Sequence, residues 1–193
     1  MQDQAWQRPA TRLPLRPEAF RVPGRPAAAA GRGTRPKVLV SFGTVFANPA
    51  VLGPILRELS TMDVDIVATA DPDGYEVERV AFVGFTPMSE LLDGVDVVIT
   101  HGGAGTTFGT LSRGIPLVVV PQGADNFIQA ERVAASGAGV ALPPDAAPRA
   151  VAKAAGTVLG DIRIREAAAA VGKEIDSMPT PGEVAATLAA AVG

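Results

Sequence analysis

The turn at residues 100–107 (THGGAGTT) is the part of the sequence best suited to chemistry. It stands directly after an apolar run and opens a helical pattern. Its glycines leave the backbone open to a ligand, and the first N–H groups of a helix carry partial positive charge. We therefore expect the turn to bind an anion, with phosphate as the first choice, and His101 to add a donor. The alternative is a structural turn with a satisfied histidine.

Two well-known phosphate-binding patterns do not fit this turn. The P-loop needs a lysine after its last glycine, where this sequence has Thr106. The dinucleotide pattern needs a glycine three positions past Gly105, where Phe108 stands, and it belongs after the first strand of its fold. The turn therefore favours phosphate binding of another kind.

Two further loops carry polar groups that could join the same site. Asp125 and Asn126 offer a carboxylate and an amide, which suit the vicinal hydroxyls of a sugar, although an aspartate N-cap on the next helix is the alternative. The hydroxyls of Ser41 and Thr44 flank another turn at a strand end. That turn is either part of the same cleft or purely structural.

The composition excludes several classes of protein. The 193 residues are enough for one domain, and 47% hydrophobic with 19% charged residues is typical of a globular protein. No cysteine and a single histidine exclude disulfide scaffolds, thiolate zinc sites, cysteine nucleophiles and multi-histidine metal centres. A net charge of -3 gives no support for nucleic-acid binding. Because no apolar run has the length of a transmembrane segment and the start has no signal-like apolar region, we expect a cytoplasmic protein.

Charge divides the chain into two parts. Residues 1–36 hold seven arginines against two acids together with six prolines, which predicts a linker or an N-terminal arm. Residues 37–193 carry the apolar patterns of a folded domain. Strands are expected at residues 38–42, 64–69, 80–84, 95–100, 116–120 and 139–142. Helices are expected from the cap Asn48 and Pro49, at 105–113, at 125–136, and, after the sixth strand, as Ala-rich helices to the C-terminus with a break at 179–182.

Short apolar strands that alternate with helices predict an α/β fold, a Rossmann-like doubly wound parallel sheet. In such folds ligands lie beyond the carboxyl ends of the strands. That rule selects the loops at residues 43–47, 85–89, 101–107 and 122–126.

Five blocks of the sequence resemble the C-terminal half of GT-B glycosyltransferases of the UDP-glycosyltransferase superfamily, in its actinomycete antibiotic and macrolide form. The blocks are VLVSFGT (38–44), VGFTPMSELL (83–92), DVVITHGGAGTT (96–107), GIPLVVVPQGADN (114–126) and QAERVAASGAG (129–139). The resemblance covers about Pro36–Val192, and residues 13–26 loosely resemble the end of the family's N-terminal domain and its interdomain linker.

The resemblance implies a nucleotide-sugar site in residues 37–193. It would place the diphosphate against His101, Gly103, Gly105, Thr106 and Thr107, with Ser41 and Thr44 on the same side of the cleft. It would place the base against Phe85 and the donor-sugar hydroxyls against Asp125 and Asn126. Asn126 stands where the family usually has a glutamine, and Gly109 stands where plant members carry a ribose-binding glutamate, so ribose recognition stays unassigned.

The resemblance further implies an inverting, metal-independent transfer of a hexose from a UDP- or TDP-sugar to a small natural-product-like acceptor, with no cofactor. The DxD spacings at residues 63–65 and 71–73, which hold a divalent metal in some glycosyltransferases, are better explained as strand and turn residues. The family's general base is a histidine of the N-terminal domain. We therefore expect half an active site that an acceptor-binding domain or subunit completes. The alternatives are a truncated, non-catalytic domain that binds a nucleotide or a partner, and a nucleotide-sugar 2-epimerase.

Overall fold

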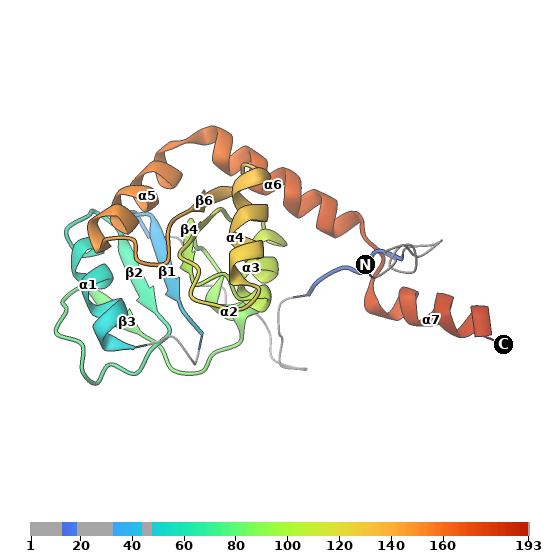
Figure 1. Cartoon of the computed structure of the whole chain (residues 1–193), viewed down its shortest axis with the longest axis horizontal. Helices are drawn as coiled ribbons and strands as arrows, with labels where there is room; N and C mark the ends of the chain where they lie inside the picture. Colours follow the sequence, from blue (N-terminus) through green and yellow to red (C-terminus); the bar gives the residue numbers. More distant parts are fainter. Residues whose placement is uncertain (1–12, 19–32, 44–47, 193) are drawn as a thin grey trace, which may run out of the picture.

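The computed structural model describes residues 13–18, 33–43 and 48–192. Its six strands form one parallel sheet in the order β3-β2-β1-β4-β5-β6, which Figure 1 shows with helices on both sides. The strands are β1 (Lys37–Ser41), β2 (Asp65–Ala68), β3 (Val80–Phe82), β4 (Val97–Thr100), β5 (Leu117–Val119) and β6 (Gly139–Ala141). This strand order reverses direction between β1 and β4, so the predicted doubly wound, Rossmann-like fold is confirmed.

The helices lie close to the predicted positions. They are α1 (Pro49–Leu59), α2 (Met88–Leu91), α3 (Ala104–Leu111), α4 (Asn126–Ala135), α5 (Pro148–Gly160), α6 (Ile162–Ser177) and α7 (Pro181–Val192). The expected strands at 64–69, 80–84, 95–100, 116–120 and 139–142 are one or two residues too long, because most of the residues that flank the paired segments are apolar as well. The one-turn helix α2 was not expected, since four residues are too few to show a helical period.

Alternate strand residues face two separate apolar cores. Val38, Val40, Val97 and Ile99 pack under the helices α1 and α5 on one face of the sheet. Leu39, Val98, Leu117 and Val119 pack on the opposite face, together with buried residues of α3, α4 and α6. Burial on both faces explains why the strands read as unbroken apolar runs rather than as alternating patterns. The sheet is therefore a fixed platform for the loops at its carboxyl edge.

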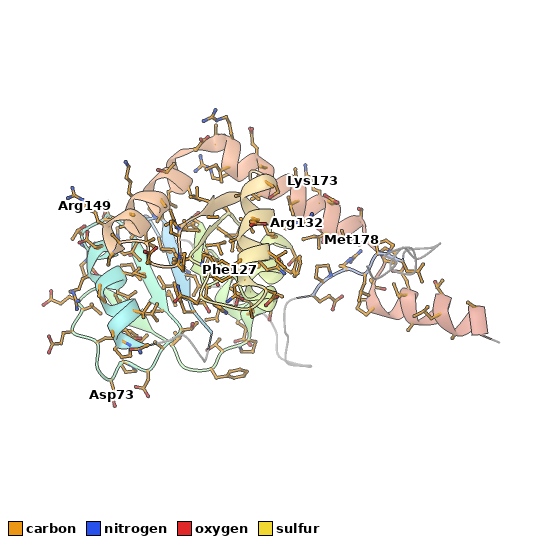
Figure 2. The ribbon with its side chains drawn as sticks, viewed as in Figure 1. Asp73, Phe127, Arg132, Arg149, Lys173 and Met178 are labelled. Atoms are coloured by element: carbon orange, nitrogen blue, oxygen red, sulfur yellow. The ribbon has the colours of Figure 1, made fainter. Side chains whose placement is uncertain are left out.

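Residues 13–18 of the expected arm lie against the bend between α6 and α7. The Arg16 main-chain N–H donates to the Pro179 carbonyl at 2.9 Å, and its guanidinium donates to the carbonyls of Met178, at 3.0 Å, and Asp176. Met178 marks this bend in Figure 2, and α7 extends from it away from the sheet in Figure 1. No helix within the described ranges combines the length and the apolar content needed to cross a membrane.

Candidate functional site

A cavity of about 450 Å³ lies at the carboxyl edge of the sheet. The ends of β1, β2 and β3, the helix α2 and the first turn of α3 supply its walls. The wall residues that matter below are Ser41, Gly43, Thr69, Asp71, Phe85 and Thr106. This is the edge at which doubly wound folds bind their ligands.

His101 directly follows β4 and lies between two glycines. A Cβ built on Gly43 would be 3.1 Å from His101 Cε1, and one built on Gly103 would be 2.6 Å from Nε2. Gly43 also has φ +64°, a backbone conformation that side chains rarely adopt. The two glycines therefore make room for the imidazole between the loop after β1 and the amino end of α3.

The surroundings of His101 favour its neutral form. Burial lowers the pKa of the imidazole below its usual value, while a hydrogen bond to the Ser41 backbone and the charge of Asp125 raise it in part. Thr100 Oγ1 lies 3.5 Å from His101 Nδ1 and accepts from the Gly102 N–H at 3.3 Å. A bound anion would act in the same direction as Asp125 and favour the imidazolium.

The amino end of α3 has no side-chain cap, because its N-cap residue is Gly103. The Thr107 N–H donates to the Gly103 carbonyl at 2.9 Å, and the N–H groups of Ala104, Gly105 and Thr106 precede that bond. Three backbone donors at the start of a helix, next to an imidazole, suit an anion. A Cβ on Gly105 would meet no atom within 4 Å, so the space beside this residue of the first turn is open.

The structure brings some of the expected site residues to the cavity and keeps others away from it. Ser41, Phe85 and Thr106 line it, and Phe85 is 87% exposed at its rim. The Thr107 side chain is 1% exposed, and its hydroxyl is buried without a hydrogen-bond partner among the described residues. Thr44 lies outside the described residues.

Asp125 and Asn126 follow β5. In the sheet this strand lies on one side of β4, the strand before His101, and β1 and β2 lie on the other side. Asp125 is exposed, and its side chain does not cap α4, so the capping alternative is not observed. Asn126 is only 4% exposed and packs beside Gly102, where an added Cβ would lie 3.0 Å from the Asn126 carbonyl oxygen. Of the two, the aspartate is the one open to a ligand.

Two wall residues that sequence reasoning missed, Thr69 and Asp71, come from the end of β2. The four loops selected from the sequence left out the loop after the second strand. The rule that ligands lie beyond the carboxyl ends of the strands holds for the second strand as well. Had it been applied there, it would have selected Thr69 and Asp71.

The DxD pairs take other roles in the structure. Asp63 and Asp65 lie at the start of β2, at the opposite edge of the sheet from the cavity, where Arg35 approaches them to 3.8 Å and 2.6 Å. Asp71 accepts from the Asp73 N–H at 3.1 Å, which closes a turn. Within the residues that the structure describes, no three His, Cys, Asp or Glu side chains gather into a group that could hold a metal ion.

Comparison with known proteins identifies relatives with the same fold. Residues 54–191 match the family described as Erythromycin biosynthesis protein CIII-like, C-terminal domain. The L-demethylnoviosyl transferase of Streptomyces niveus is 34% identical over 178 residues, which are 83% of this chain and 45% of that protein.

Solved structures agree with that match. The glycosyltransferase SnogD from Streptomyces nogalater superposes with a TM-score of 0.81 at 27% identity, over 97% of this chain and 53% of that one. The Streptomyces sp. SF2575 glycosyltransferase SsfS6, complexed with thymidine diphosphate, superposes with a TM-score of 0.74 at 28% identity, over 89% of this chain and 46% of that one. The chain spans about half the length of these relatives. It belongs to the CIII-like C-terminal domain family of actinomycete macrolide and antibiotic glycosyltransferases, whose structures have the GT-B fold.

Proposed function

We propose that this chain binds the donor, a UDP- or TDP-sugar, for an inverting, metal-independent glycosyltransferase that transfers a hexose to a small natural-product-like acceptor. The observation that carries the proposal is the uncapped amino end of α3, which lines the cavity with Thr106 and has His101 against its N-cap residue Gly103. The complex of SsfS6 with thymidine diphosphate supports the same class of ligand. In this proposal residues 37–193 form the donor domain and residues 1–36 form the arm before it.

Each part of the donor has a fitting neighbour. The amides of Ala104, Gly105 and Thr106 and the imidazole of His101 hold the diphosphate in this proposal. The nucleoside occupies the cavity, whose volume of about 450 Å³ falls within the usual range for ligand sites. Phe85 stands at its rim against the base, and Asp125 accepts hydrogen bonds from sugar hydroxyls.

The same groups account for the leaving-group half of the reaction. Direct displacement at the anomeric carbon leaves a nucleoside diphosphate, on which negative charge develops. Fixed amides and an imidazolium stabilise that charge without a metal ion, because they already point at the position it takes. His101 is the single histidine of the 193 residues and in this proposal stands at the diphosphate, so a histidine that activates the acceptor hydroxyl would have to come from another domain or chain.

Isothermal titration of the 193-residue chain with TDP, UDP and their glucose conjugates tests donor binding. We expect binding to at least one diphosphate, and His101→Ala should weaken it by about 10- to 100-fold, the usual worth of a hydrogen bond to a charged group. Thr157→Val, which alters a hydroxyl that bonds the Lys153 carbonyl within α5, is the matched control and should leave affinity unchanged.

A chain that binds none of these ligands would contradict the proposal and favour a non-catalytic domain that binds a partner. Transfer of sugar should appear only when an acceptor-binding domain, such as the N-terminal half of a relative, is added. Sugar transfer by the 193 residues alone would contradict the proposal that they hold only half of an active site.

A further inference from the structure

Thr69 connects the end of β2 to the end of β1. Its main-chain N–H donates to the Val40 carbonyl at 3.0 Å, which holds the residue in line with the sheet beyond the last strand pair. Its Oγ1 donates to Ser41 Oγ, also at 3.0 Å. Both residues line the cavity that we assign to the donor nucleotide, so the hydroxyl pair lies at its wall.

Ser41 is held from two other directions. It ends β1 and pairs in register with Thr100, the residue before His101. Its backbone is hydrogen-bonded to the His101 ring, and its side chain is almost fully buried. The Ser41 hydroxyl therefore has few positions open to it, and its contact with Thr69 helps to decide where its proton points.

A hydroxyl has one proton to donate and two lone pairs that accept. When Thr69 donates to Ser41 Oγ, one lone pair is used and the Ser41 proton stays free for another acceptor. Accepting one hydrogen bond also strengthens the bond that the same hydroxyl donates. A phosphate oxygen bound near the end of β1 would be a strong acceptor for that proton.

We propose that Thr69 is a positioning residue, which directs the proton of the Ser41 hydroxyl at a phosphate oxygen of the donor nucleotide. The inference rests on the proposed function, since it needs the diphosphate of a bound nucleotide to lie within reach of Ser41. It assigns Thr69 no contact of its own with the ligand.

A double-mutant cycle measured by isothermal titration of the full chain tests this role. TDP is the probe, or UDP if the unmodified chain binds UDP more tightly. Thr69→Val should weaken binding by about 3- to 10-fold, the worth of one neutral hydrogen bond, and Ser41→Ala should cost a similar factor. In the Ser41→Ala background, Thr69→Val should have no further effect.

Conservative variants separate positioning from packing. Thr69→Ser keeps the hydroxyl and loses only a methyl group, so it should bind TDP within about twofold of the unmodified chain. Thr69→Ala removes the hydroxyl without adding a methyl group, so it should show the same loss as Thr69→Val. Thymidine, which has no phosphate, should bind the unmodified chain and Thr69→Val equally. Urea unfolding confirms that each variant is folded.

Three results would overturn the inference while the chain still binds its nucleotide. They are an unchanged affinity in Thr69→Val, an additional loss when Thr69→Val is added to Ser41→Ala, and an equal loss for thymidine. A chain that binds neither TDP nor UDP would fail earlier, at the proposed function itself, so the two failures are distinguishable.

Discussion

The helices α1 and α3 are the helices that follow the neighbouring strands β1 and β4, and their amino ends are built differently. At α1, Asn48 Oδ1 accepts from the Ala50 N–H at 2.9 Å, and Pro49 occupies a first-turn position where an N–H would have no partner. At α3, Gly103 supplies no such acceptor. The chain thus satisfies the amino end of one helix by itself and leaves that of the neighbouring helix open. An open amino end contributes less to stability, and it is available to a ligand.

Giving α3 a side-chain cap is expected to lower TDP affinity more than any other substitution described below. In Gly103→Asp the new carboxylate would accept from the first-turn amides and repel phosphate, and its Cβ would displace the His101 ring. Gly103 has φ -60° and ψ 136°, which any residue can adopt, so the backbone itself is not strained by the change. We expect TDP affinity by isothermal titration to fall by about 100-fold or more.

Gly103→Ala is the matched control for this substitution. It moves the imidazole without supplying a cap, so its loss of affinity should resemble that of His101→Ala and stay below that of Gly103→Asp. If Gly103→Asp bound TDP as tightly as the unmodified chain, the open amino end of α3 would not be the phosphate site, and this difference from α1 would have no functional meaning.

Removing the cap of α1 should change stability and not binding. Asn48→Ala leaves the Ala50 N–H without its acceptor and should lower the free energy of unfolding by about 1 kcal/mol in urea titrations. Asp161→Ala at α6, where the carboxylate accepts from the Arg163 N–H at 2.9 Å, should have a similar effect. TDP affinity should stay within about twofold in both variants. If Asn48→Ala weakened TDP binding as strongly as Gly103→Asp, the phosphate would belong to α1.

The smallest expected effect is on the pH dependence of the free energy of unfolding. Burial lowers the pKa of His101 in the folded chain below its usual value of 6.5, so in the window just below 6.5 the unfolded chain binds a proton that the folded chain does not. The free energy of unfolding should therefore fall as pH drops through this window. His101→Gln should remove that part of the slope in urea titrations between about pH 5.5 and 7.5.

Saturating TDP sharpens the pH test, because a bound diphosphate favours the imidazolium. The loss of stability with falling pH should then shrink or reverse. If the free energy of unfolding depended on pH in the same way in His101→Gln, the pH dependence would come from groups other than His101.

The sequence was sufficient for the features that are local in the chain. The cap of α1 follows from the adjacent residues Asn48 and Pro49, and the structure confirms it. The apolar runs located every strand to within a few residues, because strands buried on both faces contain little else. The turn before α3 was visible from its glycines, which are close together in the chain.

Features that depend on the packing of distant segments were not predictable. Thr69 and Ser41 are 28 residues apart, and only the register of β1 against β2 brings their hydroxyls together. The sequence left open whether Asp125 caps α4 or meets a ligand, and it did not indicate that Asn126 is buried. The contact of Asn126 with the turn at Gly102 decides its burial, and no local pattern records that contact.

The most direct test of the central claim is an amide ¹H–¹⁵N NMR titration of the isotopically labelled chain with TDP. The account predicts that the amide resonances of Ala104, Gly105 and Thr106 shift strongly as the site fills, together with the ring signals of His101, while the Ala50 amide at the amino end of α1 stays in place. Saturable binding that leaves the three α3 amides unchanged would contradict it.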